Sequence, residues 1–281
     1  MSSDKSRHLV PDFLIIGAQK AGTTTLFRDL IGHPKIFLPE DKEPWTLTKF
    51  GDEDEAILSD YASLFRPAKD GQLKGEASTS YTMRPHFDGV AERALRICGT
   101  GLRLIYLQRE PVKRLISQYQ HEYGLREIEG TLEDCVLTDS RFVDISSYDF
   151  QLEPWLQRFP AEQLLILSFE EYVRDRAGTL AKVARFLDVD VALMQDPDVE
   201  RVHNPSDGKP VATGFMRTLI ESKFYQRVVK PRVPWEVRDK IMAMILPAAR
   251  KSENSMSPDV EMIIRKRLAE RNSGAVDGDV E

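Results

Sequence analysis

The stretch DFLIIGAQKAGTTTLFRDLIG, Asp12 to Gly32, joins an apolar run to a glycine-bracketed turn and then to a helix-forming segment. Phe13 to Ile16 predict a buried strand, Gly17 to Gly22 a loop, and Thr23 to Leu30 a helix. A strand, loop and helix in this order direct several backbone N–H groups and the positive end of a helix dipole to one point. The stretch therefore predicts a phosphate-binding loop.

The position of the lysine separates this loop from that of P-loop NTPases. Gly17 and Gly22 have the spacing G-x-x-x-x-G, but Thr23 follows the second glycine where an NTPase has its lysine. The loop's lysine is Lys20. The second strand also ends in Gln108-Arg109 and not in a magnesium-binding aspartate. A P-loop kinase or NTPase is the alternative interpretation. Its activity would depend on magnesium, so a test of magnesium dependence would distinguish the two interpretations.

Composition limits the class of protein. A chain of 281 residues with 30% charged and 41% hydrophobic residues is typical of one globular α/β domain. The net charge of −6 argues against a general nucleic-acid binder. Because we find neither a signal peptide nor a membrane-spanning run, we expect a cytoplasmic protein. The five histidines lack metal-ligand spacing, so we predict no metal site.

Strand and helix patterns alternate along the chain. After the first unit, strands are expected at 73–76, 102–107 and 163–167, and helices at 54–65, 86–98, 132–138 and 148–158. A further helix opens at Pro111, and helical patterns return at 234–246 and 260–268. This alternation predicts an α/β fold, a central parallel β-sheet with helices on both faces. We expect a flexible N-terminus at 1–11, a single domain at 12–270 and a disordered tail at 271–281, with a long polar loop at 199–214.

A second motif, Arg109-x-Pro111-x-x-Arg114-x-x-Ser117-x-Tyr119, spans a strand end and the first turns of a helix. An arginine at a strand end can bind a phosphate through two N–H groups, and a serine on the next helix can donate to the same group. Helical spacing places Arg114, Ser117 and His121 on one face. Surface ion pairs are the competing explanation for these arginines.

Together, QKAGTTTL (Gln19 to Leu26) and the second motif about ninety residues later resemble the sulfotransferase superfamily, which uses 3′-phosphoadenosine 5′-phosphosulfate (PAPS). The likeness covers Asp12 to about Val191 and is closest to the bacterial carbohydrate-type and heparan-sulfate-type branch. It implies a PAPS-dependent sulfotransferase with PAPS as co-substrate and without a metal. It also implies that Arg109 and Ser117 bind the 3′-phosphate. The implied 5′-phosphosulfate loop consists of Gln19, Lys20, Ala21, Gly22, Thr23, Thr24 and Thr25.

In the same branch, a Lys-Glu pair after the first helix carries the catalytic base, and Lys42-Glu43 matches it. A partly desolvated carboxylate can remove the proton of an attacking hydroxyl. Glu40 and Asp41 are rivals for this role. The resemblance implies in-line transfer of the sulfonyl group to a hydroxyl, or less readily an amine, of a carbohydrate, lipid, small-molecule or carrier-bound acceptor. Lys20 would stabilise the leaving phosphate, and we add His121 as a catalytic candidate.

The chain departs from the branch at Ala77, in GEASTSY, where the heparan-sulfate enzymes carry a second lysine. Arg84, Lys42 or His121 are the candidates to replace it, and a glycosaminoglycan acceptor is in doubt. Lys209 and Arg217 are weaker candidates for covering the 3′-phosphate. For the acceptor pocket we name three aromatic residues, Trp45, Phe50 and Tyr81. A scaffold that binds nucleotide without turnover is a further alternative, and the sequence does not give the oligomeric state.

Overall fold

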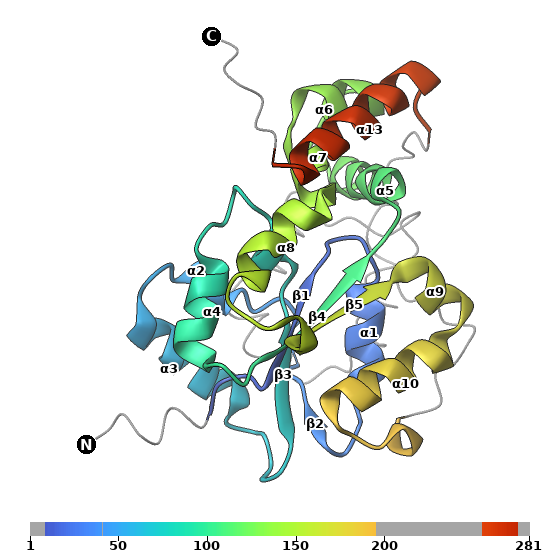
Figure 1. The fold of residues 1–281 in the computed structure, drawn as a ribbon. Coiled ribbons are helices and arrows are strands. Elements are labelled where there is room, and N and C mark those ends of the chain that lie inside the picture. The colour runs from blue at the N-terminus through green and yellow to red at the C-terminus, as the bar shows by residue number, and fades with distance from the viewer. Residues whose placement is uncertain (1–8, 41, 195–254, 275–281) are drawn as a thin grey trace.

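The computed structural model describes residues 9–40, 42–194 and 255–274, and a parallel sheet forms its centre (Figure 1). The strands are β1 (Phe13–Gly17), β2 (Ile36–Phe37), β3 (Leu73–Ala77), β4 (Arg103–Gln108) and β5 (Leu164–Ser168). They lie in the order β2-β3-β1-β4-β5, and every neighbouring pair is parallel. All five residues of β1 are buried, as expected for the apolar central strand of a sheet covered on both faces. The predicted α/β fold is confirmed.

Helices cover the sheet and extend beyond its carboxyl end. They are α1 (Thr23–Leu30), α2 (Thr46–Lys49), α3 (Asp54–Phe65), α4 (Val90–Cys98), α5 (Pro111–Gly124), α6 (Leu132–Thr138), α7 (Arg141–Ser146), α8 (Tyr148–Leu156), α9 (Phe169–Arg174), α10 (Arg176–Leu187) and α13 (Pro258–Asn272). Figure 1 shows α1, α9 and α10 on one side of the sheet and α3, α4 and α8 on the other. None of the described helices is long and apolar enough to cross a lipid bilayer.

A second hydrophobic cluster lies apart from the sheet, among α5, α6, α7 and α13 (Figure 1). On α13, Val260, Ile264 and Leu268 are buried at four-residue spacing. The Arg271 guanidinium on the last turn of α13 forms an ion pair with Asp144, with 2.8 Å between the nitrogen and the oxygen. Residues 271 and 272, which we expected in the disordered tail, therefore belong to a packed helix.

Other expectations need smaller corrections. Leu9 and Val10, expected in the flexible N-terminus, pack against the main core. The helix expected at 86–98 begins only at Val90, because Gly89 before it adopts a positive φ of 72°. We did not predict β2, α2, α7 or α9. The segments 199–214 and 234–246 lie outside the described residues, and so do Lys209 and Arg217.

The carboxyl end of β1 lies at the topological switch point of the sheet, where the strand order reverses. β3 and β2 lie on one side of β1, and β4 and β5 lie on the other. Ligands of parallel sheets bind outside the carboxyl ends of the strands at such switch points. The loop after β1 and the start of α5 after β4 are therefore neighbours at the expected position of a site.

One carboxyl group is buried at the end of β3. Glu76 has no exposed surface, and its oxygens accept hydrogen bonds from three hydroxyl groups. The Tyr61 hydroxyl lies at 2.9 Å, the Ser78 hydroxyl at 3.4 Å, and the Tyr81 hydroxyl closes the set. Burial outweighs these hydrogen bonds and raises the pKa of Glu76 to about 7. Tyr81, expected to line a pocket for the acceptor, instead holds this carboxyl group in the core.

The raised pKa gives a prediction about stability. The folded protein holds a proton on Glu76 up to about pH 7, whereas the unfolded chain releases it near 4.5. The free energy of unfolding should therefore fall as the pH rises from about 4.5 to about 7, by on the order of 3 kcal/mol from this group. Glu76→Gln, which keeps an acceptor for the tyrosines, should remove that part of the slope in urea unfolding at several pH values. The exposed Glu162→Gln is the matched control and should keep it; equal slopes for wild type and Glu76→Gln would contradict the prediction.

Candidate active site

The loop between β1 and α1 has the geometry of an anion site. Gly22 precedes α1 with a φ of 92°, in the left-handed region, and has no side chain to cap the helix. A Cβ at this position would lie 2.8 Å from Cδ2 of Phe169, so the ring also requires glycine here. Lys20, inside the loop, has a φ of 66°. The first turn of α1 thus presents its backbone N–H groups at the switch point of the sheet.

Arg109, at the end of β4, lies against this loop. Its Nη1 donates to the carbonyl oxygen of Lys20 at 3.3 Å, and its guanidinium lies 4.9 Å from the centroid of the Phe169 ring. The Tyr148 hydroxyl fixes its backbone by donating to the Arg109 carbonyl oxygen at 2.6 Å. Burial lowers the pKa of Arg109, and its buried Nε has no partner among the described residues. A buried guanidinium N–H without an acceptor is suited to an anionic ligand.

Ser117 and His121 reach the same region from α5, one helical turn apart, and both line the cavity described below. Arg114 does not join them. It is completely buried and donates to the Ser146 hydroxyl at 2.7 Å and to Gln118 Oε1 at 2.6 Å. Burial lowers its pKa to about 10. Arg114 therefore does not line the cavity with Ser117 and His121, because its guanidinium binds Ser146 and the Phe142 carbonyl oxygen of α7.

Glu43 lies on the other side of the loop, between β2 and α2. Its backbone N–H donates to the carbonyl oxygen of Ala77 at 2.9 Å. Its carboxylate accepts from the backbone N–H of Thr79 at 2.8 Å and from Nε1 of Trp45 at 3.1 Å, and it forms an ion pair with Lys42. The side chain is 24% exposed, so the carboxylate is both held in place and open to a ligand.

The segment that holds Glu43 is rich in hydroxyl groups, as the sequence GEASTSY shows. It begins in β3 and continues as a short 3₁₀ turn, η2 (Thr79–Thr82). Besides the contacts of Glu43, the N–H of Trp45 donates to the Ser78 hydroxyl at 3.1 Å and the N–H of Leu47 to the Tyr81 hydroxyl at 3.1 Å. Two adjacent chain segments, residues 43–48 and 77–81, therefore hold each other through side chains.

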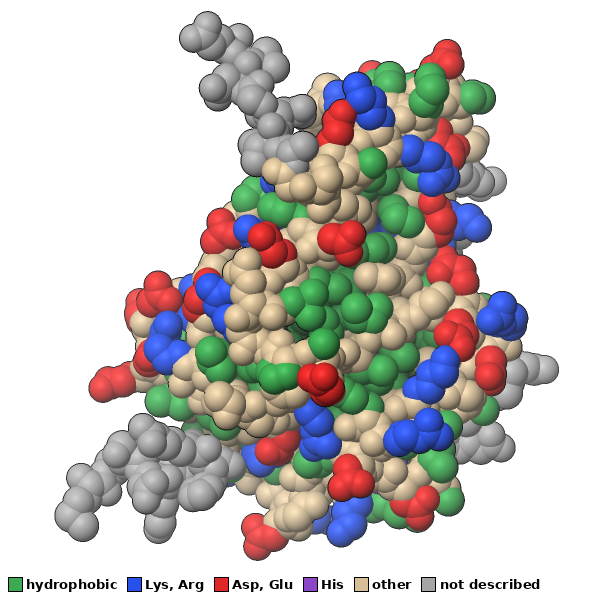
Figure 2. Space-filling view, viewed as in Figure 1, with side chains coloured by type: hydrophobic (Ala, Val, Ile, Leu, Met, Phe, Trp, Pro, Cys, Tyr) green, Lys and Arg blue, Asp and Glu red, His purple; other side chains and the backbone are tan. Residues whose placement is uncertain are grey.

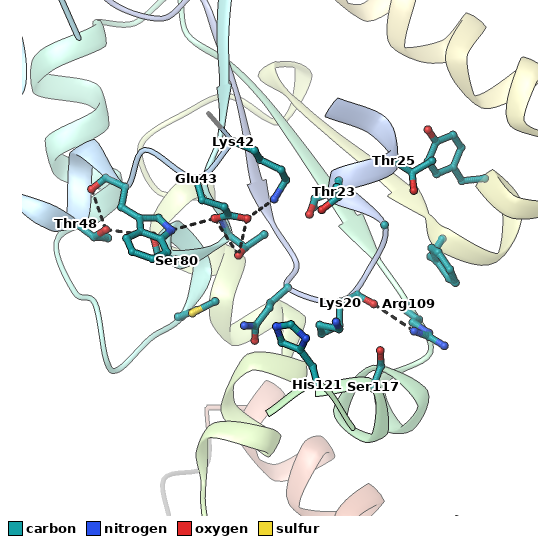
Figure 3. Close-up of a pocket in the computed structure, with 18 of the residues that line it drawn as sticks. Lys20, Thr23, Thr25, Lys42, Glu43, Thr48, Ser80, Arg109, Ser117 and His121 are labelled. Atoms are coloured by element: carbon teal, nitrogen blue, oxygen red, sulfur yellow. Dashed lines mark hydrogen bonds and ion pairs between the residues drawn. The ribbon is translucent and has the colours of Figure 1, made fainter. Parts of the chain in front are cut away.

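A cavity of about 660 Å³ joins these parts. It brings together the following predicted residues: Gln19, Lys20, Gly22, Thr23, Thr24, Thr25, Glu43, Arg109, Ser117 and His121. In the view of Figure 3, Lys20 lies between Glu43 on one side and Arg109 with Ser117 on the other. Ala21, in the same loop, is buried and does not line the cavity.

The rivals of Glu43 and the other candidates lie elsewhere. Glu40 is exposed and does not line the cavity, and Asp41 is outside the described residues. Arg84, a candidate to replace the missing lysine, forms ion pairs with Asp88 and Glu153 beside a different cavity. Phe50 packs against the main core. Lys42 and His121 remain in the cavity as candidates for the role of that lysine.

Part of the cavity was not predicted. Phe169, Tyr172, Val173 and Arg176 line it from α9 and the start of α10. Arg176 Nε donates to an oxygen of Asp29 on α1 at 2.9 Å, and the Tyr172 hydroxyl bonds the same carboxylate. These contacts fix α9 beside α1. The sequence did contain a signal for this part of the cavity. A segment that directly follows a parallel strand, as α9 does, must begin at the carboxyl edge of the sheet, where ligands bind.

The described side chains offer no candidate metal site. Within residues 9–40, 42–194 and 255–274, no group of three or more His, Cys, Asp or Glu side chains is placed to bind a metal ion. The polar side chains that line the cavity, in the described part of the chain, are hydroxyls, the Gln19 amide, the His121 imidazole, the Glu43 carboxylate and cationic groups. This set of groups suits an anionic ligand with a hydroxyl partner.

Two solved structures share the fold. The crystal structure of a sulfotransferase from Alicyclobacillus acidocaldarius superposes with a TM-score of 0.60 at 23% identity, and the match covers 82% of this chain and 99% of that chain. Retinol dehydratase in complex with retinol and 3′-phosphoadenosine 5′-phosphate (PAP) superposes with a TM-score of 0.51 at 14% identity. That match covers 99% of this chain and 86% of the other.

Sequence comparison identifies the family. Human heparan sulfate glucosamine 3-O-sulfotransferase 3A1 is 30% identical over 193 residues, which cover 66% of this chain and 46% of that protein. The chain thus spans about half the length of the curated relatives it matches. A family model described as the sulfotransferase domain matches residues 10–205, well over half of the chain. The predicted resemblance is confirmed: the chain belongs to the sulfotransferase domain family.

Proposed function

We propose that the protein transfers the sulfonyl group of PAPS to an acceptor hydroxyl, or less readily to an amine. The observation that carries this proposal is that the Glu43 carboxylate and the Lys20 loop open on the same cavity as Arg109 and Ser117. A base and an anion site that share one cavity are what transfer from a phosphosulfate requires. Membership of the sulfotransferase family supports the proposal, and the kinase alternative finds no support in the family match.

The residues of the cavity fit the donor. PAPS supplies a sulfonyl group attached to a phosphate leaving group. The loop from Gln19 to Thr25 would hold the 5′-phosphosulfate through backbone N–H groups, the threonine hydroxyls and Lys20. Arg109 and Ser117 would hold the 3′-phosphate. The buried Nε of Arg109, which has no partner in the described part of the chain, supports this assignment because an anion would satisfy it.

In the transfer itself, Glu43 would accept the proton of the acceptor hydroxyl. The acceptor oxygen forms a bond to sulfur while the bond between sulfur and the phosphate oxygen breaks, and its electron pair leaves with the phosphate. Lys20 would stabilise the charge that develops on that phosphate. Hydrogen bonds from Thr79 and Trp45 hold the Glu43 carboxylate in one orientation. His121, on the cavity wall, is proposed as an additional proton-transfer group near the acceptor.

Independence of a metal and a cytoplasmic location belong to the same proposal. The described helices offer no membrane span. The donor site as proposed holds its phosphates with cationic side chains and N–H groups, so a divalent ion is not needed for charge neutralisation. EDTA should accordingly leave turnover unchanged.

The donor site can be tested by calorimetric titration with PAP in the presence of EDTA. Wild type should bind PAP without metal and more tightly than ATP. Arg109→Ala should weaken PAP binding about ten- to a hundredfold, because a charged hydrogen-bond donor to a phosphate is lost. Arg66→Ala, an exposed arginine at the end of α3, is the control and should bind like wild type. A preference for ATP that depends on magnesium would favour the kinase instead.

The base can be tested separately from the donor. Glu43→Gln should bind PAP with wild-type affinity but lose roughly 10²- to 10⁴-fold in turnover on an alcohol, as expected when a general base is removed. Turnover is measured with radiolabelled PAPS. Glu40→Gln changes an exposed carboxylate three residues away and should remain fully active. If Glu43→Gln lost PAP binding as well, Glu43 would have a structural role and not the proposed one.

A further inference from the structure

Part of the cavity lining is apolar. We call this surface the acceptor wall and define it as Trp45, Met83 and Phe87, all of which line the cavity. Trp45 is 53% exposed and Phe87 is 38% exposed, so both side chains leave apolar surface available for contact with a ligand. The hydrogen bond from Trp45 Nε1 to Glu43 fixes the indole at the edge of the base.

Three of the residues that line the cavity with the acceptor wall, Thr48, Thr79 and Ser80, carry uncharged hydroxyls. In Figure 3, Thr48 and Ser80 lie on the side of Glu43 that is away from Arg109. Their hydroxyl oxygens are 3.1 Å apart, and the Thr48 hydroxyl also donates to the Trp45 carbonyl oxygen at 3.1 Å. Thr79 uses its backbone N–H and its hydroxyl on the Glu43 carboxylate. Such hydroxyls can orient a neutral polar group by hydrogen bonds but offer no charge to an anion.

Within the described part of the chain, the cationic side chains at this end of the cavity are Lys42 and Lys49, and both are paired with acids. Lys42 forms an ion pair with Glu43. Lys49 Nζ lies 3.7 Å from Asp60 Oδ1 and 4.6 Å from the centroid of the Phe50 ring. Among the described residues on the face shown in Figure 2, basic and acidic side chains are interspersed. A polyanionic acceptor would have to displace these acids or bind against them.

We propose that the acceptor is an uncharged amphipathic alcohol, with an aliphatic or aromatic body against the acceptor wall and its hydroxyl at Glu43. This rests on the proposed sulfonyl transfer. The wall supplies apolar contact area, the hydroxyls of Thr48 and Ser80 bind the polar end, and the reacting oxygen reaches the carboxylate. The acceptor thus differs in class from the heparan sulfate glucosamine in the name of the human relative.

The test compares matched acceptors with radiolabelled PAPS. n-Octyl β-D-glucopyranoside and methyl β-D-glucopyranoside differ only in the apolar chain, 2-phenylethanol supplies an aromatic body, and a heparan sulfate hexasaccharide supplies a polyanion. At least one of the two amphipathic alcohols should be sulfated with a KM about tenfold or more below that of the methyl glucoside, because roughly 60 Å² of apolar contact area gives a tenfold gain. The hexasaccharide should be the poorer acceptor.

Two variants separate the apolar contact from charge. Phe87→Ala should raise the KM for the amphipathic acceptor about three- to tenfold, with PAP affinity unchanged, and Met83→Ala should act in the same direction. Lys49→Gln should leave that KM within about twofold. A polyanionic acceptor would give the opposite pattern, with Lys49→Gln impaired and Phe87→Ala normal.

The outcomes distinguish this inference from the proposed function. If PAP does not bind to the wild-type protein, the sulfotransferase proposal itself fails. If PAP binds, the acceptor assignment is overturned when the hexasaccharide is the preferred acceptor, when the octyl chain brings no gain and 2-phenylethanol is not sulfated, or when none of the four compounds is sulfated. If PAP binds and Phe87→Ala raises the KM as described, the acceptor wall is assigned.

Discussion

The contact between the Phe169 ring, the backbone of Gly22 and the guanidinium of Arg109 is the constraint on which the donor half of the cavity depends. The ring approaches Gly22 so closely that a Cβ would not fit, and Arg109 lies over the same ring while it donates to the loop carbonyl of Lys20. Three strands, β1, β4 and β5, end at this contact. Because each strand delivers one partner, the parallel order of the sheet determines the geometry of the anion site.

The acceptor half is built in another way. No strand end aims Glu43 directly; instead, the loop after β2 is attached to η2 and the end of β3 by side-chain hydrogen bonds. The buried Glu76 lies beneath this attachment and orders the hydroxyls of Ser78 and Tyr81 that the loop uses. A carboxyl group in the core therefore supports a second carboxylate at the surface of the cavity.

Local signals in the sequence were sufficient to predict the phosphate-binding loop and the parallel sheet. The apolar run of β1, the two glycines and the helical spacing that follows predicted the first unit, and the alternation of strands and helices predicted the parallel sheet. β2 was not predicted, because a strand of two residues is too short to show an alternation of apolar and polar side chains. Arg114 was misplaced because helical spacing shows which residues share a face but not which face another helix covers. The burial of Tyr81 also could not be predicted from local sequence. It depends on the buried Glu76, which in turn contacts Tyr61 of the distant helix α3. The assigned roles of the cavity residues stay predictions.

The two halves of the cavity lie on opposite sides of the central strand β1. Arg109 and Phe169, in the donor half, follow β4 and β5. Glu43 and Trp45, in the acceptor half, follow β2 and are attached to the end of β3. Substitutions in the hydroxyl-rich attachment or in the residues around Trp45 would leave the Gly22, Phe169 and Arg109 contact untouched. Such a division lets natural selection exchange one partner of a reaction while the machinery for the other stays fixed. Within a family built on this sheet, divergence should therefore accumulate on the β2 and β3 side faster than on the β4 and β5 side.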